Sequence, residues 1–249
     1  MFPEIPARDI PRADTEQMIE VDRAMIVDFH IELIQMMENV GRNLAHLART
    51  RFLDGDPTGK RVLVMAGAGG NGGGALVAAR RLSNWGARVH VALGQEPDKM
   101  RPVPAHQLDI LQRMGVEGTR VSAVTEGLNK SVFNLILDGL IGYSLKGQPR
   151  GVIAELITYA NASGVSILAL DTPSGVDAAS GTVYAPAIKA AATMMLALPK
   201  TGLSAANVLP QTGELFLADI SVPPGLYESA ALSMQVGALF ARNEILKLV

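Results

Sequence analysis

Hydrophobic residues recur along this chain with two different periods. Between residues 15 and 52 they return every three or four positions, which predicts two amphipathic helices, and Asp14 and Thr15 can cap the first of them. The predicted apolar faces carry Met18, Val21, Met25 and Ile26 in the first helix and Leu33, Met37, Val40, Leu44 and Leu47 in the second. From Lys60 onward, short apolar runs predict strands at 62–66, 88–93, 135–137, 165–170, 193–198 and 214–220.

Helical segments at 75–85, 105–114 and 152–162 separate several of these strands. Alternation of helices with nearly all-apolar strands is typical of a parallel sheet that is covered on both faces. We therefore expect an α/β protein with a mostly parallel sheet and with the two N-terminal helices packed at one end of it. Residues 1–14 contain three prolines and should form an extended arm. With no internal repeat or low-complexity segment, residues 1–249 are predicted to form one domain.

Composition narrows the classes of function. Of the 249 residues, 48% are hydrophobic and 18% are charged, which is typical of a folded soluble protein. A net charge of −2 argues against nucleic acid or an anionic membrane surface as the main partner. The absence of cysteine excludes disulfides and thiolate metal sites and is compatible with a cytoplasmic location. The sequence has neither a long apolar run nor a signal-like start, so we expect no membrane partner.

The glycine-rich stretch 67–74 lies between a predicted strand and a predicted helix, and six of its eight residues are glycine. Such a turn can offer free backbone N–H groups to a phosphate, or it can simply be a tight strand–helix crossing. It also satisfies the dinucleotide fingerprint G-x-G-x-x-G. However, the acidic residue expected at the end of the second strand is missing, since Glu96 comes late. A hydride-transfer oxidoreductase is therefore the second hypothesis.

Polar residues follow three of the predicted strands. Asn71 lies in the glycine-rich stretch, Asp138 ends the strand 135–137, and Asp171 and Ser174 follow the strand 165–170. Each could merely stabilise a turn. In a parallel sheet, however, the carboxyl ends of all strands lie at one edge, where ligands bind. Two carboxylates, an amide and a hydroxyl at that edge could perform acid–base chemistry or hold a hard cation.

Taken together, these motifs resemble the NAD(P)H-hydrate epimerase family, also called the YjeF N-terminal domain family. The resemblance spans about residues 15–203. It rests on the segments 36–41, 67–75, 79–82, 138–142, 171–175 and 200–203, the last of which is Lys200-Thr201-Gly202-Leu203. The chain departs from the family pattern at Gly70, where the family has asparagine, at Gly74, where it has aspartate, and at Ala75, where it has glycine.

The resemblance implies a three-layer, Rossmann-like α/β/α sandwich that interconverts the R and S forms of hydrated NADH and NADPH, a repair reaction of nicotinamide nucleotides. It implies a potassium ion held by Asn71, Asp138 and Ser174. Asp171 is the candidate catalytic acid–base. The implied contacts to the substrate are Asn71, Gly72, Gly73, Gly74, Gly142, Tyr143, Ser144, Leu145, Lys146 and Asp171. The family's partner enzyme, NAD(P)H-hydrate dehydratase, would be a separate chain.

Two further expectations concern assembly and activity. The helices at 15–52 carry more apolar surface than a small cap on the sheet requires, which predicts a homodimer in which they take part. The third hypothesis is a non-catalytic module for nucleotide binding or dimerisation, because relatives of such domains serve as scaffolds when site residues decay. Asn71, Asp138, Asp171 and Ser174 argue against that hypothesis, and Gly74 argues for it.

Overall fold

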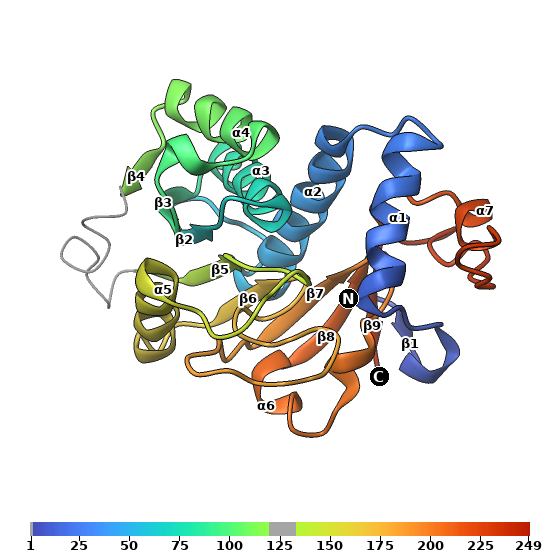
Figure 1. Ribbon diagram of the computed structural model, residues 1–249. Coiled ribbons are helices and arrows are strands. Elements are labelled where there is room, and N and C mark those ends of the chain that lie inside the picture. The colour runs from blue at the N-terminus through green and yellow to red at the C-terminus, as the bar shows by residue number, and fades with distance from the viewer. Residues whose placement is uncertain (1, 120–132) are drawn as a thin grey trace.

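The computed structural model describes residues 2–119 and 133–249. Within them the strands form one nine-stranded sheet in the order β1-β9-β8-β7-β6-β5-β2-β3-β4 (Figure 1). All neighbouring strands are parallel except the pair β8 and β9, so the prediction of a mostly parallel sheet is confirmed. The strands are β1 (Glu4–Ile5), β2 (Arg61–Ala66), β3 (Arg88–Leu93), β4 (Glu117–Thr119), β5 (Leu135–Gly139), β6 (Ile167–Leu170), β7 (Ala192–Leu196), β8 (Glu214–Ala218) and β9 (Ile245–Leu248).

Helices cover both faces of this sheet. They are α1 (Thr15–Val27), α2 (Leu33–Phe52), α3 (Gly70–Asn84), α4 (Pro102–Arg113), α5 (Gly151–Ala162), α6 (Leu209–Thr212) and α7 (Pro224–Tyr227). Successive side chains of a strand point to opposite faces. Val62 and Val64 of β2 accordingly belong to the core beneath α2 and α3, whereas Leu63 and Met65 pack into the core beneath α5. The three-layer α/β/α sandwich is therefore confirmed.

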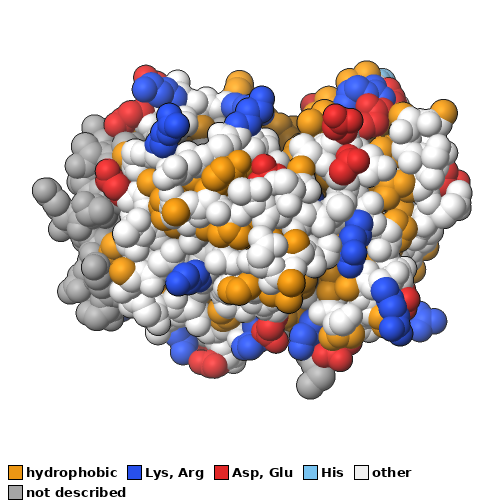
Figure 2. Space-filling view, turned by 60° about the horizontal axis from the view of Figure 1, so that its bottom comes forward, with side chains coloured by type: hydrophobic (Ala, Val, Ile, Leu, Met, Phe, Trp, Pro, Cys, Tyr) orange, Lys and Arg blue, Asp and Glu red, His pale blue; other side chains and the backbone are white. Residues whose placement is uncertain are grey.

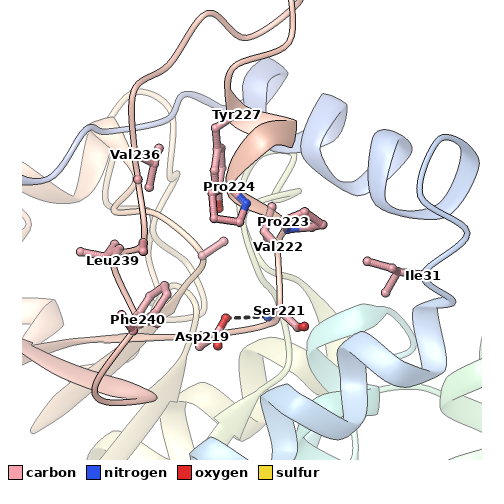
Figure 3. A pocket seen from close by; sticks show the side chains of 14 residues that line it. Ile31, Asp219, Ser221, Val222, Pro223, Pro224, Tyr227, Val236, Leu239 and Phe240 are labelled. Carbon is pink, nitrogen blue, oxygen red and sulfur yellow. Dashed lines mark hydrogen bonds between the residues drawn. The ribbon is translucent and has the colours of Figure 1, made fainter.

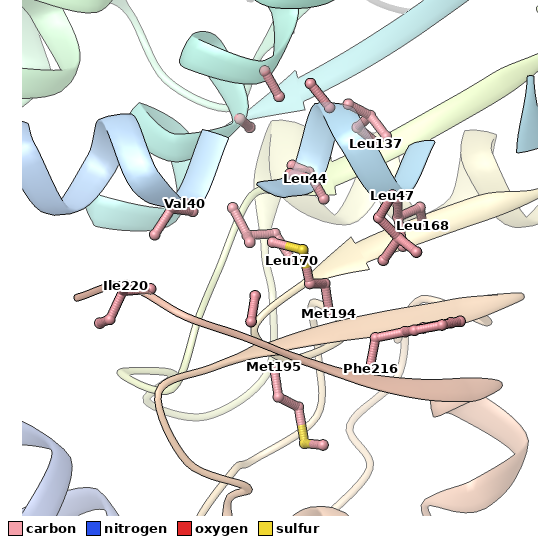
Figure 4. Packing of buried hydrophobic residues seen from close by; sticks show 14 of the residues in the cluster. Val40, Leu44, Leu47, Leu137, Leu168, Leu170, Met194, Met195, Phe216 and Ile220 are labelled. Atoms are coloured by element: carbon pink, nitrogen blue, oxygen red, sulfur yellow. The ribbon is translucent and has the colours of Figure 1, made fainter. Parts of the chain in front are cut away.

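The second helix does not lie where the sequence analysis placed it. Instead of packing at one end of the sheet, α2 lies across its face beside α3, and its Leu44 and Leu47 lie near Leu137 of β5 and Leu168 of β6 (Figure 4). Leu44 and Leu47 are fully buried there. The apolar stripe of α2 is thus part of the central core, because an entire sheet face was available to bury it.

The two ends of the described chain meet at one edge of the sheet. In the predicted arm, β1 pairs in parallel with β9, a 3₁₀ turn follows at Ala7–Asp9, and Ala13 makes an isolated bridge to Lys200. Asp14 then caps α1 as expected, accepting a hydrogen bond of 2.8 Å from the backbone N–H of Gln17. The sequence analysis did not foresee β1, β4 and β9, which are short strands near the edges.

The exposed residues are of mixed character. Acidic and basic side chains are interspersed over the face shown in Figure 2, with smaller hydrophobic areas between them. On α1, Ile19, Ile26 and Val27 are exposed, so Ile26 lies outside the core to which its spacing assigned it. No helix in the described part of the chain is both long and apolar enough to cross a membrane.

Candidate active site

The order of the strands defines where a ligand can bind. From β2 the chain continues outward to β3 and β4, and it then returns to β5 on the other side of β2. The crevice beyond the carboxyl ends of β2 and β5 is thus a topological switch point, the place where open α/β sheets bind ligands. Asn71 follows β2 and Asp138 lies within β5, so the fold brings both residues to this crevice.

Asp138 and Ser174 form a buried hydrogen-bonded pair. The backbone N–H of Ser174 donates to Oδ2 of Asp138 over 2.8 Å, and the hydroxyl of Ser174 donates to Oδ1 over 2.7 Å. The N–H of Leu140 also donates to Oδ1, at 3.3 Å. No ion pair to Asp138 exists among the described residues, and burial raises the pKa of its carboxyl to about 6 although these hydrogen bonds act in the opposite direction. The Asp138 carboxylate therefore lies out of water without a positive neighbour.

Asn71 lies in the first turn of α3, beside this pair. Its side-chain N–H donates to the carbonyl of Leu170 over 2.8 Å, while its Oδ1 lies against Gly142, where an added Cβ would be only 2.7 Å away. The crevice therefore offers carboxamide, carboxylate and hydroxyl oxygens, a set that suits a hard monovalent cation better than a transition metal. Within residues 2–119 and 133–249, no cluster of three histidine, cysteine or acidic side chains provides an alternative metal site.

Asp171 is buried and is paired with a lysine that the sequence analysis did not assign to the site. Nζ of Lys200 donates to Oδ1 of Asp171, and it also donates to the carbonyl of Leu196 over 2.7 Å. Both side chains are almost completely buried, at 1% and 2% exposure. On the other oxygen, Oδ2, Asp171 accepts a hydrogen bond of 3.3 Å from the backbone N–H of Tyr143. The pair is thus a buried, charge-compensated ion pair held by further hydrogen bonds.

The backbone around this pair is sharply turned. Asp171 has φ +65°, in the left-handed region, and the N–H of Thr172 closes a three-residue turn onto the carbonyl of Leu170 at 2.8 Å. After the neighbouring strand β7, Ala197 repeats this arrangement with φ +62°. Such turns are rare and strained, and strain of this kind is concentrated at functional sites. The isolated β-bridge between Lys200 and Ala13 holds the backbone of Lys200 in place.

Asp171 and Lys200 face a cavity of about 90 Å³ between the sheet edge and the helices α1 and α2. Its polar wall also includes Asn71 and Tyr143, and Asp22 of α1 contributes a further carboxylate. The rest of the lining is apolar and consists of Met18, Leu33, Met36, Met37, Val40, Leu196 and Ile220. The cavity therefore combines groups that can form hydrogen bonds and exchange protons with apolar surface that can pack against a flat ring.

Most glycines of the stretch 67–74 have a structural role that the sequence did not reveal. Helix α3 begins at Gly70 rather than at Ala75, and Gly72–Gly74 are buried within it. A Cβ on Gly73 would lie 2.3 Å from Sδ of Met37, and one on Gly74 would lie 2.5 Å from Cγ1 of Val40. These glycines let α2 approach α3. Only Gly69 and Gly70 have open space around them, and Gly70 lines the cavity.

The loop after β5 contributes unequally to the site. Tyr143 lines the cavity, and Gly142 packs against Asn71. In contrast, Ser144 and Lys146 are exposed and Leu145 is half-buried, and none of the three lines the cavity. The predicted residues that the structure brings together are therefore Asn71, Asp138, Gly142, Tyr143, Asp171 and Ser174, with Lys200 and Asp22 as additions.

A second cavity, of about 350 Å³, lies beyond the carboxyl ends of β7 and β8 (Figure 3). Pro223, Pro224, Tyr227 and Phe240 line it, together with Asp219, whose carboxylate accepts a hydrogen bond from the N–H of Ser221. Although this cavity is larger, it contains none of the residues paired above. We therefore take the crevice around Asp171 as the candidate active site.

Comparison with known proteins agrees with the fold and identifies the family. The model of the YjeF-related protein N-terminus family matches residues 33–202, and the chain belongs to this family. The family resemblance stated from the sequence is thereby confirmed. The crystal structure of the yeast protein ynu0 (YNL200c) has the same fold, with a TM-score of 0.81 over 96% of this chain and 100% of that one, at 24% sequence identity.

Among curated relatives, the NAD(P)H-hydrate epimerase of Dehalogenimonas lykanthroporepellens is 45% identical over 86% of this chain and 84% of its own length. The NAD(P)H-hydrate epimerase of Truepera radiovictrix is 36% identical over 82% of this chain and 87% of its own. The bifunctional NAD(P)H-hydrate repair enzyme Nnr of Salinibacter ruber is 32% identical, but this chain covers only 41% of that longer protein.

Proposed function

We propose that this protein is an isomerase that interconverts the R and S forms of hydrated NADH and NADPH. The observation that carries the proposal is the Asp171–Lys200 pair, which faces a cavity lined by both polar and apolar side chains at the switch point of the sheet. The curated relatives named NAD(P)H-hydrate epimerase support the same reaction. This family assignment favours the epimerase over a hydride-transfer oxidoreductase.

The two epimers differ at the ring carbon beside the ring nitrogen, which carries the hydroxyl. Inverting that centre requires either loss and re-addition of the hydroxyl or a transient opening of the ring. In the first route the departing hydroxyl takes up a proton and the water that re-adds loses one; in the second the hydroxyl loses its proton as the ring opens and regains it as the ring closes. Either way an enzyme group must give up a proton and recover it. Asp171 can accept and return a proton in the cavity. Lys200 supplies the positive charge that this carboxylate needs out of water.

The apolar lining of the cavity and the start of α3 would bind different parts of the substrate. Met36, Met37 and Val40 offer packing surface to the flat nicotinamide ring. Helix α3 begins at Gly70, directly after Gly69, and both glycines have open space around them. The free N–H groups of such a helix N-terminus attract phosphate. The pyrophosphate is therefore assigned to this end of α3, and the ring to the cavity beside Asp171.

A potassium ion completes the proposed site. Asn71, Asp138 and Ser174 would hold it through oxygen ligands, and its charge would compensate the buried Asp138 carboxylate. Support comes from the donor chemistry and from the lack of an ion pair to Asp138 among the described residues. Its chemical contribution would be electrostatic, since potassium has no redox function here.

The organisation of the protein in the cell belongs to the same proposal. Residues 1–249 form one domain, supported by the pairing of β1 with β9, which joins the two ends of the described chain. The exposed Ile19, Ile26, Val27 and Phe29 of the α1 region support a homodimer, which light scattering at micromolar protein can test.

We place the protein in the cytoplasm, where NAD(P)H-hydrate dehydratase would be a separate chain. Longer relatives are named bifunctional NAD(P)H-hydrate repair enzymes.

The deciding experiment mixes the pure protein with one hydrate epimer in potassium buffer and follows the ratio of the two epimers. We expect equilibration faster than in the protein-free control, with neither epimer consumed. Asp171→Asn should reduce the rate roughly 10²- to 10⁴-fold, the usual contribution of a single acid–base group, because an amide cannot cycle a proton. Asp98→Asn, at an exposed surface residue, is the matched control. Equilibration no faster than the protein-free control would refute the function, and full activity of Asp171→Asn would refute this residue's role.

A further inference from the structure

Helix α1 brings a carboxylate to the site that no sequence motif marks. Asp22 lies on the same face of α1 as Met18 and Met25, which are 2% and 0% exposed. Both Asp22 and Met18 line the cavity of Asp171. A carboxylate on the buried stripe of an amphipathic helix is costly unless a partner compensates it. The partner is the phenol of Tyr143, whose hydroxyl donates to Oδ2 of Asp22.

Tyr143 joins two parts of the site through different atoms. Its side chain reaches Asp22 on α1, while its backbone N–H donates to Oδ2 of Asp171 at 3.3 Å. The residue before it, Gly142, packs on the side chain of Asn71. Tyr143 therefore fixes the loop after β5 against α1, and this loop in turn contacts the catalytic carboxylate. The sequence separation of 121 residues between Asp22 and Tyr143 shows that the contact is tertiary.

We propose that Asp22 is a positioning residue: by holding the Tyr143 hydroxyl, it fixes the loop after β5 over the cavity and so orients Asp171 and the bound ring. The inference rests on the proposed epimerase function for its kinetic readout. It assigns Asp22 no proton transfer. What matters is the hydrogen bond that Asp22 accepts, so a neutral acceptor of the same shape should serve in its place.

The test compares Tyr143→Phe, Asp22→Ala, Asp22→Asn and the double variant Asp22→Ala/Tyr143→Phe. A hydrogen bond to a charged group is strong enough that losing it should reduce kcat/KM roughly tenfold to hundredfold in Tyr143→Phe and in Asp22→Ala. The double variant should lose no more than the worse single variant, because both changes remove the same contact. Asp22→Asn should keep most of the activity, since the amide oxygen can still accept from the phenol.

Asp28→Asn is the matched control, because Asp28 follows the same helix and pairs with Arg23 at the surface. Wild type and this control report whether the protein epimerises at all, so a failed function is distinguished from a failed inference. Independently of activity, hydrogen exchange of residues 140–147 should be faster in Tyr143→Phe and Asp22→Ala than in wild type. Additive losses of kcat/KM in the double variant would overturn the inference. So would an Asp22→Asn variant that is as impaired as Asp22→Ala, or an unchanged rate of hydrogen exchange at residues 140–147.

Discussion

Replacing Lys200 by methionine tests the buried ion pair most directly. Methionine keeps much of the length and apolar volume of the lysine stem but removes the ammonium. Asp171 would then lose the donor on Oδ1 and keep only the N–H of Tyr143 on Oδ2, while the carbonyl of Leu196 would lose its bond from Nζ. The variant thus leaves a carboxylate that is 2% exposed without its positive partner.

The magnitude follows from this burial. Removing one member of a buried ion pair typically costs about 3–5 kcal/mol, because the remaining charge stays out of water uncompensated. For a protein of this size, 1 kcal/mol shifts Tm by roughly 2–4 °C. We therefore expect Lys200→Met to lower Tm by roughly 6–20 °C and to reduce epimerisation strongly. A surface ion pair would contribute far less, in the range of about 0–1 kcal/mol.

The assay is urea unfolding at neutral pH, with Lys60→Met as the matched control. Lys60 also pairs with an aspartate, Asp54, at 3.0 Å, but that pair is exposed, so its loss should cost less than about 1 kcal/mol. Combining Lys200→Met with Asp171→Leu removes both charges and should recover much of the stability while leaving the protein inactive. A free energy of unfolding for Lys200→Met equal to that of Lys60→Met would refute the reasoning.

Two further predictions concern Asp138 and Gly74. Burial raises the pKa of Asp138 from 3.8 to about 6, so the folded protein binds this proton more tightly than the unfolded chain and loses roughly 3 kcal/mol of stability as the pH rises from about 3 to about 7. Asp138→Asn should flatten this part of the pH dependence in potassium-free urea unfolding; an unchanged profile would contradict the assignment. Gly74→Asp should cost at least roughly 2 kcal/mol, because its Cβ would lie 2.5 Å from Val40, whereas Gly69→Ala, with open space around it, should cost no more than about 1 kcal/mol, the loss of a glycine N-cap. Val40→Ala should partly rescue Gly74→Asp, and a fully stable Gly74→Asp would contradict the packing argument.

The strands and the site edge could be predicted because their signals are local. Continuous apolar runs such as 62–66 mark strands that are buried on both faces, and a parallel sheet then forces Asn71, Asp138 and Asp171 to one edge. The strands β1 and β4 at the edges and β9 next to β1 have two to four residues each, so they carry no such run. Their pairing depends on partners distant in sequence, as between β1 and β9.

The misjudged features are those that depend on tertiary contacts. The density of glycines at 67–74 predicted close backbone approach, but the sequence could not show that α2, rather than a ligand, makes most of that approach. Lys200 stood in a recognised motif, yet only the structure pairs it with Asp171, 29 residues earlier. Asp22 interrupts the apolar face of α1, but the sequence analysis gave it no role, because its partner Tyr143 lies 121 residues away in the sequence.

The two buried aspartates of the site differ in how their charge is balanced, and this difference separates their roles. Asp171 has a counter-charge built into the fold, since Lys200 contacts it directly. Asp138 receives hydrogen bonds from Ser174 and Leu140 but no ion pair among the described residues, and burial raises its pKa. The ammonium of Lys200 lets Asp171 remain a carboxylate out of water, and a carboxylate is the form that can accept a proton from a substrate. A carboxylate that lacks this compensation gains most from an external cation. The environments of the two groups thus favour Asp171 for proton exchange and Asp138 for holding the ion.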